Sequence, residues 1–175
     1  MLLDVKNLKV YFGNDHTGLT KAVDDISFDV GDNEVVGIVG ESGSGKTMTA
    51  LSIMRLIPRS GYFAGGKVLF SGRDILKLDG EKMRKMRGQF ISMIFQEPFT
   101  SLNPVLMVGD QIAESILAHR SVSPKEAVEK ILELLEKVQM KDPETVYHKY
   151  PHQLSGGQRQ RIMIAMALAL RPKLL

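Results

Sequence analysis

The residues best suited to chemistry form a glycine-rich run in the first third of the chain. The run is Gly40-Glu41-Ser42-Gly43-Ser44-Gly45-Lys46-Thr47, and it matches the phosphate-binding pattern G-x-x-x-x-G-K-[ST] in full. Its glycines let the backbone turn tightly enough for successive N–H groups to point inward at phosphate oxygens. A helix that begins near Lys46 adds the positive end of its dipole. We therefore predict that Lys46 reaches the β- and γ-phosphates of a nucleotide and that the Thr47 hydroxyl ligates Mg²⁺.

A second segment that could bind an anion lies more than a hundred positions further on. Leu154-Ser155-Gly156-Gly157-Gln158 stands directly before a helix that we predict from Gln158 to Leu170. A helix start offers free N–H groups, a hydroxyl and a favourable dipole to an anion. The pentapeptide alone fits an ordinary capping turn equally well. Together with the upstream loop, it indicates a nucleotide bound from two sides.

One competing chemistry is excluded by the same residues. A serine nucleophile on a strand-to-helix turn needs the pattern G-x-S-x-G. Here Ser44 stands where the final glycine would have to be. No serine hydrolase is indicated.

The elements that must position the first loop are strands before it and a helix after it. Residues 1–40 have the alternation of strands, in Leu8, Val10 and Phe12 and again in Ile26, Phe28 and Val30. The apolar run Glu34–Gly40 predicts a strand buried on both faces of a parallel sheet. A helix is expected from Thr47 to Ile57, before Pro58, and a further strand from Lys67 to Ser71.

From Gln111 onward the chain is expected to be mostly helical. Ser123-Pro124-Lys125-Glu126 predicts a helix start, with Ser123 as N-cap and Glu126 closing a capping box. Apolar residues then recur at helical spacing and predict a packing face: Val128, Ile131, Leu135 and Val138. The basic stretch from Lys77 to Arg87 fits either a solvated helix face or an anionic contact.

Composition narrows the class of protein. The 175 residues include 43% hydrophobic and 25% charged residues, the balance of a globular domain that can bury a core. The absence of Cys excludes disulfides, thiolate metal sites and a cysteine nucleophile within these residues. The net charge of +3 is too small to indicate nucleic acid as a partner. We find no signal peptide and no apolar run long enough to span a membrane, and we expect a cytoplasmic protein.

Three motifs in order carry a resemblance to a known family. Together these motifs resemble the ATPase subunit of ABC transporters. They are the phosphate-binding loop, Met93-Ile94-Phe95-Gln96-Glu97-Pro98 and Leu154-Ser155-Gly156-Gly157-Gln158-Arg159-Gln160-Arg161. In that family two ATPase domains pair head to tail, and each phosphate-binding loop faces the partner's signature motif across ATP. The resemblance implies that Ser155, Gly157 and Gln158 contact the γ-phosphate of the partner's nucleotide. It also implies that Gln96 reaches Mg²⁺ and the attacking water and couples the site to the membrane subunits.

The same resemblance implies an aromatic platform for adenine. In the family an aromatic residue at the end of an early strand, just before a glycine, stacks on the base. Phe12 before Gly13 fits this position best, and its neighbour Tyr11 stays open as the alternative. Either ring could instead belong to the core.

The implied fold is α/β: a P-loop NTPase with a RecA-like core, an ABC-type antiparallel β subdomain and a helical subdomain. We expect one ATPase domain over 1–175, in which 1–97 hold the β subdomain and the P-loop core. Residues 98–157 are then the helical subdomain, and 158–175 return to the core. In the family a Walker B Asp, a catalytic Glu and a switch His follow a strand near Leu174. We therefore expect an incomplete domain that is marginally stable or self-associates and does not hydrolyse ATP alone.

A finer resemblance concerns the transported solute. Phe95-Gln96-Glu97-Pro98-Phe99-Thr100-Ser101-Leu102-Asn103-Pro104 is similar to the di- and oligopeptide importers. This implies an ATPase that drives peptide uptake through transmembrane permease subunits, from the inner face of the cell membrane. The alternatives are a nucleotide-binding module that never hydrolyses and a soluble ABC-type ATPase, for which the chain lacks long heptads or a basic arm.

Overall fold

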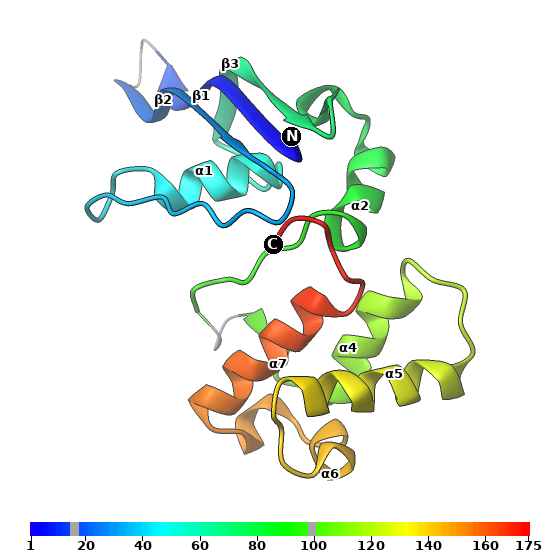
Figure 1. The fold of residues 1–175 in the computed structure, drawn as a ribbon. Helices are drawn as coiled ribbons and strands as arrows, with labels where there is room; N and C mark the ends of the chain where they lie inside the picture. Colours follow the sequence, from blue (N-terminus) through cyan, green and yellow to red (C-terminus); the bar gives the residue numbers. More distant parts are fainter. Residues whose placement is uncertain (15–17, 98–100) are drawn as a thin grey trace. The chain divides into compact units, whose positions relative to one another are not determined.

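The computed structural model describes residues 1–14, 18–97 and 101–175, which form two compact units, 1–84 and 85–175. The first unit is built on a four-stranded antiparallel sheet with the strand order β2-β1-β3-β4 (Figure 1). Its strands are β1 (Leu3–Asn14), β2 (Gly18–Val30), β3 (Gly61–Phe70) and β4 (Arg73–Asp74). The alternation of β1 buries Leu8 and Val10, as the sequence predicts.

One irregularity in the pairing of β1 with β2 helps to fix which side chains share a face. Val10 lies opposite Val23 of β2, but Tyr11 lies opposite Lys21, so that Ala22 is an extra, bulged residue. On the other side Tyr11 pairs with Tyr62 and Phe12 pairs with Gly61. The sheet therefore places Tyr11 and Phe12 on opposite faces near the end of β1.

Helix α1 (Lys46–Ile53) begins at the predicted place but ends four residues earlier than the prediction of Ile57. Arg55 adopts a left-handed φ of 50°, and the N–H of Leu56 bonds back to Leu51 O, a pattern that terminates a helix. The Arg55 guanidinium then donates to the carbonyls of Ile75 and Leu78 at 3.3 and 2.6 Å. These contacts tie the end of α1 to the short helix η1 (Ile75–Lys77) and the residue after it.

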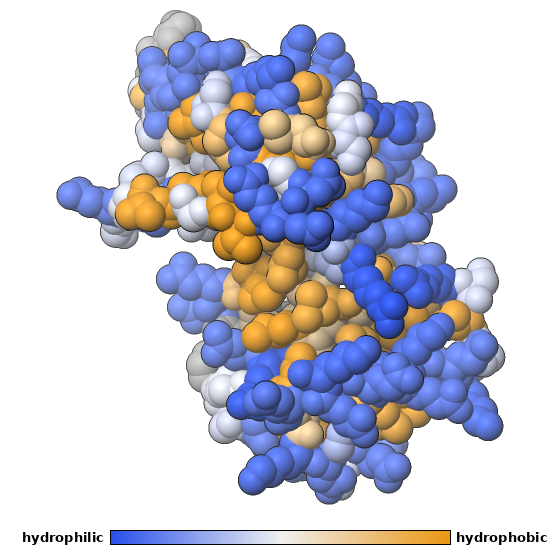
Figure 2. Space-filling view, viewed as in Figure 1, coloured by the Kyte–Doolittle hydropathy of each residue, from blue (hydrophilic) through white to orange (hydrophobic). Residues whose placement is uncertain are grey.

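The predicted strand from Glu34 to Gly40 is not formed. This segment has no regular structure, and the side chains of Val35 and Val39 are 97% and 96% exposed. A strand needs a hydrogen-bonded neighbour, and none of the described strands pairs with these residues. The apolar pattern therefore lies on the surface, and Figure 2 shows the hydrophobic side chains of this segment beside α1.

Helix α2 (Gly80–Gln89) carries most of the basic stretch, and its helical conformation is interrupted at Arg87 and Gly88. Lys82 pairs with Asp79 at 2.5 Å, and Arg84 pairs with Glu81 at 2.9 Å. Both pairs are exposed and local, which favours the interpretation of this stretch as a solvated helix face.

The second unit packs helices around their own apolar core. They are α4 (Val108–Leu117), α5 (Pro124–Lys137), α6 (Pro143–Tyr147), η2 (Pro151–Gln153) and α7 (Gly156–Leu168). In α5 the predicted capping box of Ser123 and Glu126 is present, and Ile131 and Leu135 are fully buried. Val128, predicted to face the core, is 36% exposed, and Ala127 is buried in its place. An isolated parallel bridge joins Ile91 to Leu174.

Candidate nucleotide-binding site

The glycine-rich loop is held against β2 by the glycine that precedes α1. Gly45 has a φ of 92°, and a Cβ at this position would lie 2.4 Å from the carbonyl oxygen of Ala22. Both the conformation and the space therefore require glycine. The bulge at Ala22 brings this carbonyl to the loop, so the irregularity of β2 helps to position the start of α1.

The Lys46 side chain folds back over the loop that precedes it. Its Nζ donates to the carbonyl oxygens of Gly40 and Glu41 at 2.8 and 2.7 Å. Gly43 also has a left-handed φ of 83°, which turns the backbone between these residues. The loop thus encloses an ammonium group. Phosphate oxygens of a ligand can replace the two carbonyls as hydrogen-bond acceptors of this ammonium group.

The first turn of α1 leaves donors available to a ligand. Gly45 provides no side-chain cap for the helix, and the Thr47 side chain is exposed. One turn later, Thr49 is buried, and both its N–H and its hydroxyl donate to the Gly45 carbonyl at 2.8 and 3.0 Å. Sequence reasoning missed Thr49, because a threonine inside a helix gives no signal by itself. Its two hydrogen bonds fix the residue at which the loop turns into the helix.

The two candidate aromatic residues have different surroundings. Phe12 lies on the face of the sheet that carries Val10 and Val23. Val23 lies next to Gly45 of the glycine-rich loop, because a Cβ at Gly45 would be 3.9 Å from the Val23 side chain. Phe12 is partly buried. It therefore occupies the same face as the contact between β2 and the glycine-rich loop, within one compact unit.

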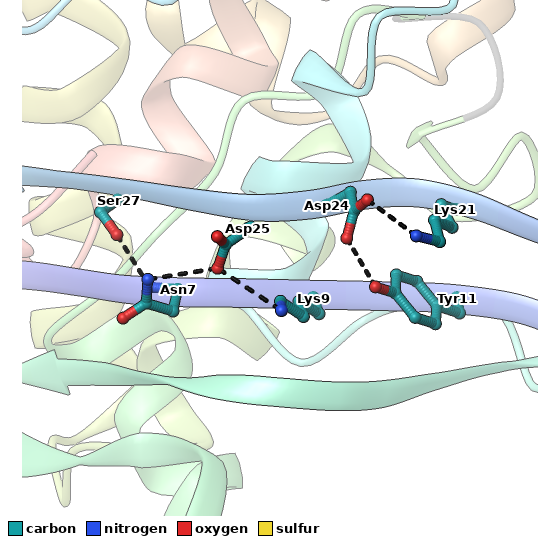
Figure 3. Close-up of polar contacts among 7 residues, drawn as sticks. All are labelled: Asn7, Lys9, Tyr11, Lys21, Asp24, Asp25 and Ser27. Atoms are coloured by element: carbon teal, nitrogen blue, oxygen red, sulfur yellow. Dashed lines mark hydrogen bonds and ion pairs between the residues drawn. The ribbon is translucent and has the colours of Figure 1, made fainter.

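Tyr11 belongs to a polar network on the other face of the sheet (Figure 3). Its hydroxyl donates to Asp24 Oδ1 at 2.5 Å, Lys21 pairs with the same carboxylate at 3.1 Å, and the Tyr11 and Tyr62 rings meet edge to face. The hydrogen bond to Asp24 is the main cause that raises the pKa of Tyr11. The same bond is the main cause that lowers the pKa of Asp24.

The turn before α7 is closed by a reciprocal capping box. The N–H of Gln158 donates to Ser155 Oγ at 3.3 Å, and the N–H of Ser155 donates to Gln158 Oε1 at 3.0 Å. Because the oxygen of Ser155 already accepts a hydrogen bond, its hydroxyl hydrogen remains for an acceptor outside the turn. A Cβ at Gly157 would meet no atom within 4 Å, so nothing among the described neighbours requires glycine there.

Gln96 lies in an exposed stretch without regular structure that follows the bridge at Ile91. The structure places Phe12 and Gly40–Thr47 in the unit 1–84 and places Gln96 and Ser155–Gln158 in the unit 85–175. Pro98, Phe99 and Thr100, which belong to the peptide-importer motif, lie outside the described residues. In the described parts of the chain, no three His, Asp or Glu side chains converge as a metal site. Nor does any helix there have the length and apolarity to cross a membrane.

Comparison with known proteins extends over the whole chain. The family model described as "ABC transporter" matches residues 23–175. The chain is 51% identical to a probable peptide ABC transporter ATP-binding protein of Sinorhizobium fredii, covering 100% of this chain and 52% of that protein. It is 50% identical to the dipeptide transport ATP-binding protein DppD of Haemophilus influenzae, with 99% and 52% covered. The chain thus spans about half the length of the curated relatives it matches.

Solved structures agree on the fold. The dimeric structure of MJ0796, described as a bacterial ABC transporter cassette, has a TM-score of 0.84 at 27% identity, with 97% of this chain and 70% of that chain covered. A dimeric post-hydrolysis state of the same cassette, bound to ADP and phosphate, has a TM-score of 0.85 at the same identity and coverage. The chain therefore belongs to the ABC transporter family and has the fold of its ATP-binding cassettes.

Proposed function

We propose that the chain binds MgATP at Gly40–Thr47 and that ATP hydrolysis drives the import of di- or oligopeptides through membrane permease subunits. The observation that carries the proposal is the loop itself, fixed on β2 by Gly45 and closed around the Lys46 ammonium. The peptide specificity is supported by the relatives, which are named as peptide and dipeptide transport ATP-binding proteins.

The proposed site residues have distinct tasks. Lys46 exchanges its two carbonyl partners for oxygens of the β- and γ-phosphates, and the loop N–H groups bind the remaining phosphate oxygens. The Thr47 hydroxyl would hold Mg²⁺, which prefers such oxygen ligands, and the family resemblance implies the Gln96 amide oxygen as a further ligand. When bound, Mg²⁺ neutralises charge on the phosphates. Gln96 also orients the attacking water.

Phe12, rather than Tyr11, is the proposed adenine platform. Phe12 lies on the face of the sheet that meets the phosphate-binding loop, while the Tyr11 hydroxyl is bound to Asp24 on the other face. An aromatic ring with one side free can stack on a purine.

The turn Ser155–Gln158 is proposed to bind the γ-phosphate held by a second ATPase subunit, in a head-to-tail dimer. The free hydroxyl hydrogen of Ser155 and the dipole of α7 suit an anion. Gly157 allows close approach, since its position is open to solvent. The dimeric state of the MJ0796 cassette supports this pairing. In the working transporter, 98–157 form the helical subdomain, and the protein lies on the inner face of the cell membrane beside the permease.

Binding of MgATP to the 175-residue chain tests the site directly. Titration calorimetry compares the wild type with Lys46→Ala and with Lys125→Ala, which removes an exposed lysine of α5. We expect Lys46→Ala to weaken binding by about tenfold or more, because it removes charge-assisted hydrogen bonds. Lys125→Ala should match the wild type. Equal affinities for all three proteins would contradict the proposed site.

Turnover separates an enzyme from a module that only binds. The family's activating Glu has no assigned counterpart among these residues, so we expect the 175-residue chain to hydrolyse no more ATP than Lys46→Ala does. Hydrolysis that Lys46→Ala abolishes would mean that an activating carboxylate lies within the chain and that our assignment of the catalytic groups is wrong.

A further inference from the structure

Gly61 of β3 has no side chain at the one place where the Phe12 ring needs the space. A Cβ at position 61 would lie 2.6 Å from Phe12 Cε1, 2.8 Å from Cζ and 3.2 Å from Cδ1. Real Cβ atoms essentially never approach other atoms so closely, so one of the two groups would have to move. The ring therefore lies directly over the site of the missing side chain.

The backbone of Gly61 does not itself require glycine. Gly61 is absent from the glycines with positive φ among the described residues, and it continues the regular pairing of β3 with Phe12. Alanine could adopt this conformation without strain. What keeps position 61 small is the neighbouring aromatic ring rather than the path of the chain.

The contact between Gly61 and Phe12 lies on one particular face of the sheet. Gly61 and Phe63 alternate with Tyr62 along β3, and Tyr62 meets Tyr11 on the other face (the face of the Figure 3 network). Phe12 and the open position at Gly61 are therefore on the side of the phosphate-binding loop.

We propose that Gly61 is a positioning residue for the adenine platform: it lets the Phe12 ring lie against the β3 backbone, with its other side free for the base. This inference rests on the proposed function and deepens it by naming a residue that sets base recognition. A methyl group at position 61 displaces the ring, because the side chain of Phe12 can rotate while the strand pairing holds. Stacking is then lost, and phosphate binding is retained.

The experiment measures two ligands on the 175-residue chain: MgATP and inorganic tripolyphosphate with Mg²⁺, which lacks a base. The variants are Gly61→Ala and Gly80→Ala, the latter a matched control because a Cβ at Gly80 meets nothing within 4 Å. We expect Gly61→Ala to weaken ATP binding by about fivefold or more, the range of a lost aromatic–base stack, and to leave tripolyphosphate affinity within about twofold. Gly80→Ala should change neither affinity.

Three other results would overturn the inference. Unchanged ATP affinity in Gly61→Ala would mean that the ring position does not matter. An equal loss for ATP and tripolyphosphate would point to a general disturbance of the fold. If the wild type binds neither ligand, the proposed function fails as well. This outcome is distinguishable from the first two, in which the wild type still binds.

A spectroscopic measurement reports on the ring itself. The sequence contains no Trp, so Phe12→Trp introduces a single indole at the platform. We expect ATP, but not tripolyphosphate, to quench its fluorescence, and we expect addition of Gly61→Ala to remove the quench. A quench that is the same with and without Gly61→Ala would contradict the positioning role.

Discussion

Tyr11 and Phe12 are neighbours in β1, yet their chemistry differs because successive strand residues point to opposite faces. The Tyr11 hydroxyl donates to Asp24, and the Tyr11 and Tyr62 rings meet in a T-shaped contact. Phe12 lies over Gly61 on the face of the phosphate-binding loop. The sequence left both aromatics open as the base platform, because the choice depends on the register of β1 with β2 and β3. A register with several shifts cannot be predicted from alternation alone.

The network of Tyr11 makes a prediction at the scale of single residues. Tyr11→Phe removes the hydrogen bond that most lowers the pKa of Asp24, so this pKa should rise toward its ordinary value. The measurement is an NMR titration of the Asp24 carboxyl carbon in both proteins. Because the folded pKa is depressed, the bond stabilises the fold above the unfolded pKa of about 4 and loses its effect as pH falls through the folded value. An unchanged Asp24 titration would show that the lysines Lys21 and Lys9, rather than Tyr11, hold this pKa down.

At the scale of elements, α5 and α7 begin with the same device and differ in its charge. Ser123 and Glu126 close the capping box of α5, and Ser155 and Gln158 close that of α7. The N–H of Ser123 is the main cause that lowers the pKa of Glu126, so a carboxylate stands at the start of α5. That negative charge repels an anion. The amide of Gln158 carries no charge, and the dipole of α7 remains available to a phosphate.

The two capping serines therefore form a matched pair for mutation. Ser123→Ala and Ser155→Ala should each lower the free energy of unfolding by about 1 kcal/mol, measured in urea. Only Ser155→Ala should weaken the ATP-dependent part of self-association, measured by sedimentation with and without MgATP. Equal effects of both variants on association would contradict a phosphate contact at Ser155. If MgATP does not change the self-association of the wild type, the head-to-tail pairing is contradicted.

Sequence reasoning succeeded where the signal is local and was wrong where it depends on distant partners. The capping box of α5 and the start of α1 depend on four to eight consecutive residues, and both are present as predicted. The end of α1 differs because Arg55 donates to carbonyls that are 20 and 23 residues away in the sequence. Val128 is exposed and Ala127 buried because the neighbours of α5, not its periodicity alone, set the width of the covered face. Gly61 gave no signal, since its importance lies in a ring on another strand.

At the scale of the whole molecule, the segment 34–40 is an apolar stretch that stays exposed. Its apolar residues have the pattern of a buried strand, but no described strand covers them. Exposed apolar β-forming segments with unpaired backbone are templates for pairing with another chain. The segment leads directly into the phosphate-binding loop, so the backbone next to the proposed nucleotide site is also unpaired.

We therefore expect the 175-residue chain to self-associate without nucleotide, through this segment. Replacing Val35 and Val39 together by Thr keeps the branched shape and β propensity but makes the exposed side chains polar. Loss of two apolar contacts should weaken association by about tenfold or more, measured by sedimentation velocity without ATP. Val105→Thr is the matched control, because Val105 is 75% exposed but lies outside the predicted strand. A monomeric wild type, or an equal effect of Val105→Thr, would show that the strand pattern of 34–40 does not drive association.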